Sequence, residues 1–177
     1  MEAPDEELML AYRDGDAGAF ETLYARHRGA LYRFVLRSLK DRDRALAEEL
    51  FQEAWIRVIE ARERYAPSAR FKTWLYTIAH NLLVDHWRRK GLTLVESDEE
   101  PVSSDNPASQ AEARQGLARF LQALEGLPPV QREAFLLHEE GGMSAAEIAA
   151  ATGTNEEAAK SRLRYALMKL RNAVSDG

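Results

Sequence analysis

The sequence predicts an all-α protein of two small helical domains joined by a flexible acidic linker. Three observations support this fold class. Alternating runs of β-branched residues are nearly absent, apolar residues recur at helical spacing over most of the 177 residues, and one polar stretch without an apolar face divides the chain. We expect the domains at residues 1–91 and 116–177, with the linker at residues 92–115.

The apolar periodicity places helices throughout both domains. In the first domain we expect helices at residues 5–14, 17–39, 43–64 and 71–89. In the second domain we expect them at residues 116–125, 129–139, 144–152 and 155–174. Pro128 and Pro129 separate the first two helices of the second domain, because proline lacks a helical donor and suits only the first turn of a helix.

The linker has the composition of a solvated segment. It contains two prolines, several serines and an acidic block formed by Glu96, Asp98, Glu99, Glu100 and Asp105. Such a stretch buries too little apolar surface to fold by itself, so we expect it to be mobile. An alternative is that the acidic block folds back on the basic faces of the domains and mimics phosphate.

The composition excludes several classes of protein. The chain has no cysteine, which excludes disulfides and thiolate metal sites. Its first residues are acidic and no run approaches 18 apolar residues, so we expect neither a secretory signal nor membrane insertion and infer a cytoplasmic protein. The net charge of -5 argues against tight binding to phosphate backbones, unless the cations are clustered or a partner supplies affinity.

The predicted helix at residues 43–64 has an acidic face. Its apolar positions form one stripe that we expect to be buried: Ala47, Leu50, Phe51, Ala54, Val58 and Ile59. A different face carries Glu48, Glu49, Gln52 and Glu53. A compact acidic face invites a basic partner, although a plain solvated helix face has the same pattern.

The segment at residues 70–91 mixes aromatic rings with cations. The rings are Phe71, Trp74, Tyr76 and Trp87. The polar side chains among them include Arg70, Lys72, His80, Asn81, His86, Arg88, Arg89 and Lys90. Rings can stack on unpaired bases while cations hold the backbone, as single-stranded nucleic acid requires, or the rings can simply form core. The two histidines are six residues apart and on different helix faces, so we expect no metal site.

The segment at residues 143–171 has the pattern of a helix-turn-helix. Capping boxes are predicted for Ser144 with Glu147 and for Thr154 with Glu157, and Gly153 can end the first helix in the left-handed conformation. In the second helix an apolar stripe is expected to be buried: Ala159, Leu163, Ala166, Leu167, Leu170 and Val174. The opposite face and its shoulders carry Lys160, Ser161, Arg162, Arg164, Tyr165 and Met168. Such a helix can read duplex DNA, although an ordinary surface helix is the alternative.

Three segments, in this order and at these separations, resemble a known family. They are AEELFQEAWIRV, FKTWLYTIAHNLLVDHWRRKG, and LPPVQREAFLLHEEGGMSAAEIAAATG followed by AAKSRLRYALMKLR. The chain is similar over nearly its full length to bacterial RNA polymerase sigma factors of the extracytoplasmic-function group. The resemblance implies a region 2 domain at residues 1–91 and a region 4 domain at residues 116–177.

The resemblance also implies roles for individual residues. The acidic face, Glu48, Glu49, Gln52 and Glu53, would dock on the clamp helices of the largest polymerase subunit. The loop at residues 66–70 would capture a flipped base of the non-template strand. The implied minus-ten contacts are Ser68, Arg70, Phe71, Lys72, Trp74, Asn81, Asp85, Arg88 and Arg89. The implied minus-thirty-five contacts in the major groove are Lys160, Ser161, Arg162, Arg164 and Tyr165.

The implied function is transcription initiation. Such a factor directs core polymerase to promoters and promotes strand opening, and we expect no enzymatic activity, no cofactor and an anti-sigma factor as a further partner. One departure concerns Glu156 and Glu157, which stand just before the basic face and repel phosphate. The residues alone leave two alternatives, a helix-turn-helix regulator that binds duplex DNA without polymerase and a helical adaptor that binds only proteins.

Overall fold

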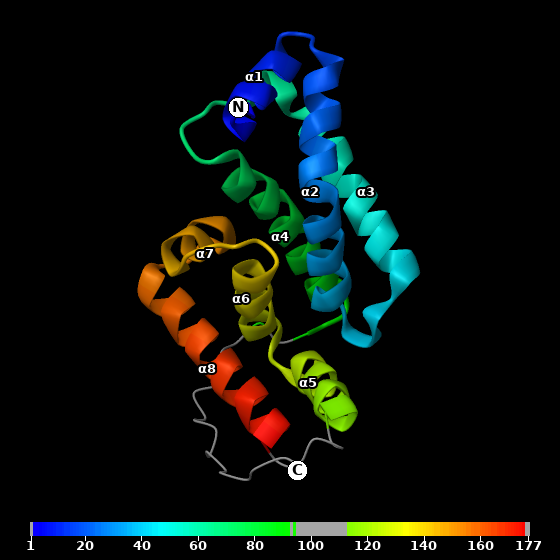
Figure 1. Ribbon diagram of the computed structural model, residues 1–177, viewed down its shortest axis with the longest axis vertical. Coiled ribbons are helices and arrows are strands. Elements are labelled where there is room, and N and C mark those ends of the chain that lie inside the picture. The colour runs from blue at the N-terminus through cyan, green and yellow to red at the C-terminus, as the bar shows by residue number, and fades with distance from the viewer. Residues whose placement is uncertain (1, 93, 95–112, 176–177) are drawn as a thin grey trace.

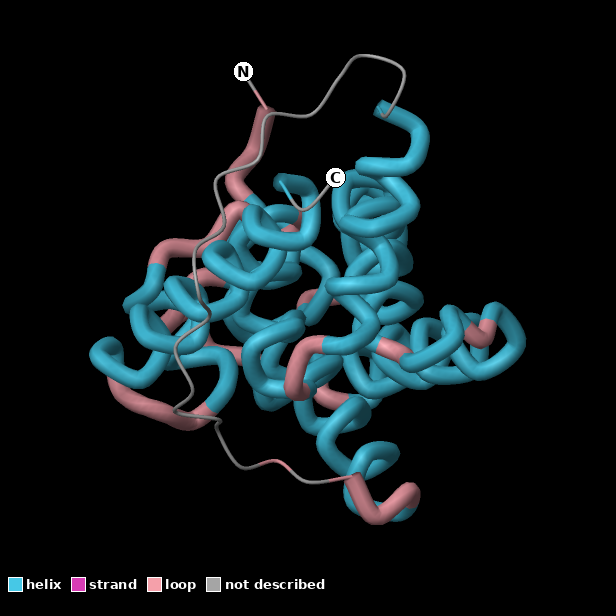
Figure 2. Tube along the Cα trace, turned by 90° about the horizontal axis from the view of Figure 1, so that it is seen from below, coloured by secondary structure: helices cyan, strands magenta, loops and turns pink. Residues whose placement is uncertain are grey.

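The computed structural model describes residues 2–92, 94 and 113–175, and within them every regular element is a helix (Figures 1 and 2). This confirms the predicted all-α fold class. The predicted linker falls mostly on residues 93 and 95–112, so its predicted mobility and the alternative of an acidic block folding back both lie outside the described residues.

The N-terminal half is a bundle of four α-helices. They are α1 (Asp5–Arg13), α2 (Ala17–Ser38), α3 (Arg44–Glu60) and α4 (Phe71–Arg89), with short 3-10 turns at η1 (Lys40–Arg42) and η2 (Arg62–Arg64). Their common core contains Phe34, Trp55, Tyr76 and Trp87 among the buried rings. Trp55 lies outside the predicted stripe of α3, yet its ring packs edge-on against Tyr24 with centroids 5.1 Å apart.

The C-terminal half contains α5 (Ala113–Gly126), α6 (Pro129–Glu139), α7 (Ala145–Thr152) and α8 (Glu156–Ser175). Helix α8 packs against the other three helices of this half. Pro129 stands at the start of α6 as predicted. The turn between α7 and α8 contains Gly153, whose φ of 69° is left-handed and whose amide donates to the Ala149 carbonyl.

Side-chain caps decide where several helices begin. Asp16 and Asp43 accept from backbone amides in the first turns of α2 and α3. The predicted capping box of Ser144 and Glu147 forms in full. The predicted box at Thr154 is wrong by one residue, because Asn155 provides the cap of α8 by accepting from the Ala158 amide at 2.8 Å.

The predicted helix at residues 43–64 was too long. Helix α3 ends at Glu60, and the chain then makes the 3-10 turn η2 before reaching Tyr65. Turn η1 was not predicted at all. Within it, Asp41 and Arg42 have φ values of 63° and 47°, a region that side chains with a Cβ rarely adopt.

The two halves pack directly against each other. Helix α6 lies on α2 and α7 lies on α4 (Figure 1), and buried side chains of both halves belong to one continuous core. The sequence predicted two domains but gave no sign of this contact. Its consequence is that one side of α4 faces α7 while another remains open to solvent.

Candidate nucleic-acid interface

Helix α4 presents one polar stripe to solvent. Asn81, Asp85, Arg88 and Arg89 are all exposed. Their spacing places them on one face of the helix, since residues three, four and seven apart lie above one another. All four were predicted as minus-ten contacts. They form a surface with both hydrogen-bonding and cationic groups, suited to base edges and phosphates.

The aromatic rings of α4 are largely core, which is one of the two alternatives that the sequence left open. Phe71 is 0% exposed, and Tyr76 and Trp87 are each 1% exposed. A ring without exposed surface cannot stack on a base in this conformation, and the implied DNA contact of Phe71 stays a prediction. Trp74 is half-buried and packs edge-on against Tyr65, with ring centroids 5.1 Å apart.

A loop of five residues precedes α4, and every one of them is exposed. It runs from Ala66 to Arg70 and includes Ser68, and it projects beside α1 in Figure 1. Arg70 lies 3.6 Å from the Glu147 carboxylate of α7, so the end of the loop touches the C-terminal half. The partly buried Lys72 approaches Gly142 in the same region.

The acidic face of α3 is open to solvent. Glu48, Glu49 and Gln52 are exposed, and Glu53 is half-exposed beside Arg57, with which it forms an ion pair at 3.5 Å. The sequence analysis missed Ile56, which lies on the same side and is 45% exposed. The sequence did indicate this exposure, because Ile56 lies outside the apolar stripe predicted to be buried.

The reading face of α8 is partly occupied by its own side chains. Lys160 is exposed but lies 3.4 Å from Glu156 one turn earlier, and Arg164 lies over the ring of Tyr165 at 5.3 Å. Ser161 and Arg162 are half-buried. Glu156, one of the two acidic residues predicted to repel phosphate, thus forms a local ion pair with Lys160.

The predicted stripe of α8 is only partly buried. Ala159, Ala166 and Leu170 are buried as expected, but Leu167 is 37% and Val174 40% exposed. Both line a groove of about 310 Å³ together with Phe120 of α5.

Polar contacts join the N-terminal and C-terminal halves of the molecule near the exposed surfaces of α4 and its preceding loop. Glu140 at the end of α6 pairs with both Arg33 and Arg37 of α2. The His80 imidazole of α4 lies 2.7 Å from Glu133 of α6, whose side chain is 1% exposed. These contacts were not predicted, because no local pattern marks two charged residues that meet from distant parts of the chain.

Two titratable side chains of α4 have shifted pKa values. Burial raises the pKa of Tyr76, and the nearby Glu140 raises it further. Burial lowers the pKa of His86, and the cations Lys90 and Arg89 lower it further. Tyr76 therefore remains an uncharged part of the core, and His86 adds no positive charge to the exposed stripe at neutral pH.

Over residues 2–92, 94 and 113–175, no group of three or more metal-binding side chains comes together. Over the same residues, no helix has the length and apolar content needed to cross a membrane.

Residues 23–93 match the family Sigma-70 region 2, and residues 117–170 match Sigma-70, region 4. The RNA polymerase sigma factor CarQ of Myxococcus xanthus is 36% identical, and the match covers 95% of this chain and 96% of that protein. The ECF RNA polymerase sigma factor SigE of Mycolicibacterium smegmatis is 33% identical over 99% of this chain and 71% of its own length. This chain is an extracytoplasmic-function sigma factor of the sigma-70 family.

Two solved structures share the fold. CnrH, in complex with the cytosolic domain of CnrY, has a TM-score of 0.69 and 27% identity over 94% of both chains. RpoE of Bartonella quintana, in complex with the anti-sigma factor NepR, has a TM-score of 0.68 over 89% of this chain and 97% of its own. At 23% identity the second likeness concerns the fold alone. The exposed stripe of α4 thus lies in the region 2 match of a sigma factor.

Proposed function

We propose that this sigma factor binds core RNA polymerase through α3 and reads two promoter elements, one through α4 and its preceding loop and one through α8. The observation that carries the proposal is the exposed polar stripe of α4. Its other sides form core or face α7, so this stripe and the adjoining loop are what α4 offers to a ligand.

The contact with polymerase is assigned to the acidic face of α3. Glu48, Glu49 and Gln52 are free of the bundle, and Glu53 extends the same surface. Basic clamp helices of the largest polymerase subunit would complement this charge, which steers association and fixes orientation. Ile56 supplies an apolar centre that a docked helix can cover.

The minus-ten element is assigned to α4 and residues 66–70. The Asn81 amide can donate to and accept from base edges, and Arg88 and Arg89 can pair with phosphates. An exposed loop can accept a base that has left the stack, and Ser68 and Arg70 supply its polar groups. Lys72 and the exposed part of Trp74 adjoin this surface, while Phe71 acts through its place in the core.

The minus-thirty-five element is assigned to α8 in the major groove. Lys160, Ser161, Arg162, Arg164 and Tyr165 supply the contacts. The ion pair between Glu156 and Lys160 competes with phosphate for one of the cations. With a net charge of -5, the chain depends on polymerase for much of its affinity for DNA.

Reading both elements requires the two halves to separate. The minus-ten and minus-thirty-five elements are centred about 25 base pairs apart along the DNA, and at about 3.4 Å per base pair this is a distance of roughly 85 Å. A compact chain of this length has a radius of gyration of about 16 Å. The packed arrangement therefore cannot reach both elements, and opening between α4 and α7 precedes or accompanies promoter binding.

The remaining assignments follow from this role. The factor acts by binding and carries out no covalent chemistry, and it works in the cytoplasm, where the polymerase is. We include an anti-sigma factor among the partners because the family resemblance implies one, and CnrH, which shares the fold, was itself solved in complex with another protein, the cytosolic domain of CnrY. Residues 1–91 then form the polymerase-binding and minus-ten domain, and residues 116–177 form the minus-thirty-five domain.

The test combines the full chain with bacterial core polymerase and a library of promoter sequences, and the DNA upstream of each transcript is sequenced. We expect co-elution with core polymerase and selective transcripts. Glu49→Lys reverses a charge on the α3 face and should weaken both, whereas Glu21→Lys, the same change at an exposed site of α2, should not. Absence of co-elution and of selective transcripts would overturn the proposal. Selective binding of duplex DNA without polymerase would favour a helix-turn-helix regulator instead.

A further inference from the structure

The loop at residues 66–70 is suspended between two buried aromatic residues. Tyr65 before it is 3% exposed and Phe71 after it is 0% exposed, while all five loop residues are exposed. The two rings pack edge-on with centroids 6.3 Å apart. Except for Arg70, which pairs with Glu147 of α7 at 3.6 Å, its own side chains are in solvent. The conformation of the loop is therefore set largely by how its two ends are anchored.

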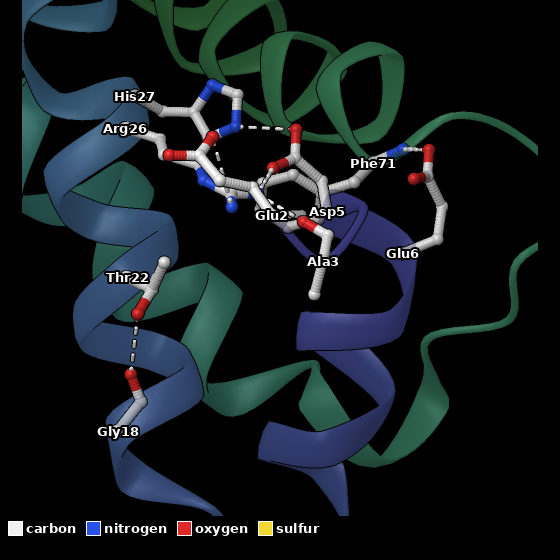
Figure 3. Close-up of polar contacts among 9 residues, drawn as sticks. All are labelled: Glu2, Ala3, Asp5, Glu6, Gly18, Thr22, Arg26, His27 and Phe71. Atoms are coloured by element: carbon white, nitrogen blue, oxygen red, sulfur yellow. Dashed lines mark hydrogen bonds and ion pairs between the residues drawn. The ribbon is translucent and has the colours of Figure 1, made fainter.

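The end of the loop is anchored by a residue far away in the sequence. Arg70 stands at the N-cap position of α4 but makes no side-chain cap. Instead, the Glu6 carboxylate of α1 accepts a hydrogen bond from the Phe71 amide at 3.0 Å (Figure 3). This bond satisfies one of the orphan donors of the first turn of α4, and the negative charge interacts favourably with the helix dipole.

Helix α1 is itself held in place by a neighbouring carboxylate. Asp5 accepts from Arg26 of α2 at 3.1 Å and lies 2.8 Å from the His27 imidazole (Figure 3). Arg26 also donates to the Ala3 carbonyl at 2.7 Å. The ring of His27 in turn contacts the ring of Phe71, with centroids 5.4 Å apart. The position of Glu6 is thus fixed through α2.

The carboxylates of α1 also act on the start of the loop. The Tyr65 hydroxyl is buried without a hydrogen-bond partner among the described residues. Burial raises the pKa of Tyr65, and Glu6 and then Asp5 raise it further. The N-terminal turn of α1 therefore lies close to both ends of the loop, although α1 precedes the segment that matches region 2 at residues 23–93.

We propose that Glu6 is a positioning residue for promoter recognition, which fixes the geometry of the loop at residues 66–70 by capping α4 from outside the matched region. The inference rests on the proposed function, in which this loop captures a base. Glu6 itself touches no DNA. Its carboxylate holds the C-terminal end of the loop at a fixed angle to α4. The distance and orientation between a captured base and the stripe at residues 81–89 are then fixed as well.

The experiment uses the full chain with core polymerase on a promoter from the library selection. Strand opening is followed by the fluorescence of 2-aminopurine placed in the minus-ten element. The quantity compared is the ratio of opening rates for the preferred base and for each substituted base. This ratio does not depend on the fraction of folded protein, so a purely structural loss of stability leaves it unchanged.

Glu6→Ala should lower this discrimination by about twofold to tenfold, as expected for the loss of one hydrogen bond. Glu6→Gln keeps an acceptor oxygen and should retain most of it. If Glu6→Ala does not fold, Glu6→Asp keeps the charge but withdraws the acceptor by one methylene, and should lower discrimination in the same direction. Glu7→Ala, at an exposed site of the same helix, is the control and should have no effect.

A further variant separates this inference from the proposed function. It replaces residues 66–70 by Gly-Ser-Gly-Ser-Gly. If this replacement abolishes base discrimination but the folded Glu6 variants keep it in full, the positioning role of Glu6 is wrong and the proposed function stands. If the replacement leaves discrimination intact, the loop captures no base, and both the loop assignment and the role of Glu6 are overturned.

Discussion

Gly153 carries the sharp turn between α7 and α8. Its φ of 69° lies in the left-handed region, and its amide closes the end of α7 by donating to the Ala149 carbonyl. A Cβ added there would meet no atom within 4 Å. The need for glycine at this position is therefore purely conformational and owes nothing to crowding.

Gly153→Ala should consequently destabilise the fold by about 1 kcal/mol, because the left-handed backbone conformation is energetically unfavourable for a residue with a Cβ atom. Gly116→Ala is a matched comparison, since Gly116 lies within α5, has no left-handed φ and has equal space around it. That substitution should stabilise by up to about 1 kcal/mol through helix propensity. Urea denaturation of both variants measures the effect, and equal shifts of the same sign would contradict this explanation.

His86 gives the stability a dependence on pH. Its pKa in the folded chain lies below the ordinary value of 6.5, so the unfolded chain binds the proton more readily. Above pH 6.5 both states are neutral at this position, and below it protonation favours unfolding. His86→Gln should therefore lose less stability than the wild type between pH 7 and pH 5, measured by denaturation at both values. If the wild type and His86→Gln lose the same stability between pH 7 and pH 5, another titratable group causes the pH dependence.

Helix α6 shows how one element is tied to its neighbours. Arg132 is 4% exposed and donates to the carbonyls of Leu124, Glu125 and Leu127 at the end of α5, and to that of Ser38 in α2. Burial lowers the pKa of the guanidinium. One side chain therefore satisfies the final turn of α5 and also joins the two halves of the molecule.

Arg132→Met should destabilise the protein by about 2–4 kcal/mol, because it leaves buried carbonyl oxygens without donors while keeping a similar volume. Arg171→Met, at an exposed site of α8, is the control and should change stability by less than about 0.5 kcal/mol. Thermal unfolding followed by circular dichroism compares the two. Similar melting temperatures for both variants would show that the corner of α5 and α6 is held by apolar packing instead.

At the scale of the whole molecule, the contact between the halves combines apolar core with charge pairs. Glu140, whose side chain is 10% exposed, pairs with two arginines that are each about half-exposed, so solvent screens much of their attraction. Glu133 is buried more deeply, at 1% exposed, and separation from His80 returns its carboxylate to water. An interface of this composition can open without unfolding either half.

Weakening these pairs should shift the molecule toward an open form. Glu133→Gln combined with Glu140→Gln removes both carboxylates, and small-angle X-ray scattering should show a radius of gyration above the compact value of about 16 Å. Glu139→Gln changes the exposed neighbour on the same helix and should leave the scattering unchanged. Higher salt should expand the wild type in the same direction. Identical profiles for all three proteins at every salt concentration would contradict an opening controlled by charge.

Much of the fold could be predicted because helices are marked locally. The bounds of α4 and α6 agree with prediction at both ends, and the Ser144 box and Gly153 were assigned correctly. The errors were also local. Asn155 took the cap predicted for Thr154, and η1 was missed because a non-glycine turn with positive φ has no sequence signature.

The candidate site was predictable to the extent that exposure follows helical spacing. The acidic face of α3 was identified from helical spacing, whereas the stripe from Asn81 to Arg89 was implied only by the resemblance to the family. The sequence left the aromatic residues open between two roles, because a ring beside a cation is equally compatible with core and with stacking. Only the position of α4 inside the bundle decided that Phe71 and Tyr76 are buried.

The sequence by itself determined the helices, most of their caps and the family, because periodicity, capping and motif spacing act within a few residues of each other. The tertiary structure alone decided which face of α4 is free, that Glu6 caps Phe71 across 65 residues, and that Arg33 meets Glu140 across 107. Such contacts depend on how whole helices pack, and packing is set by the combined shape of many side chains. No local pattern records it.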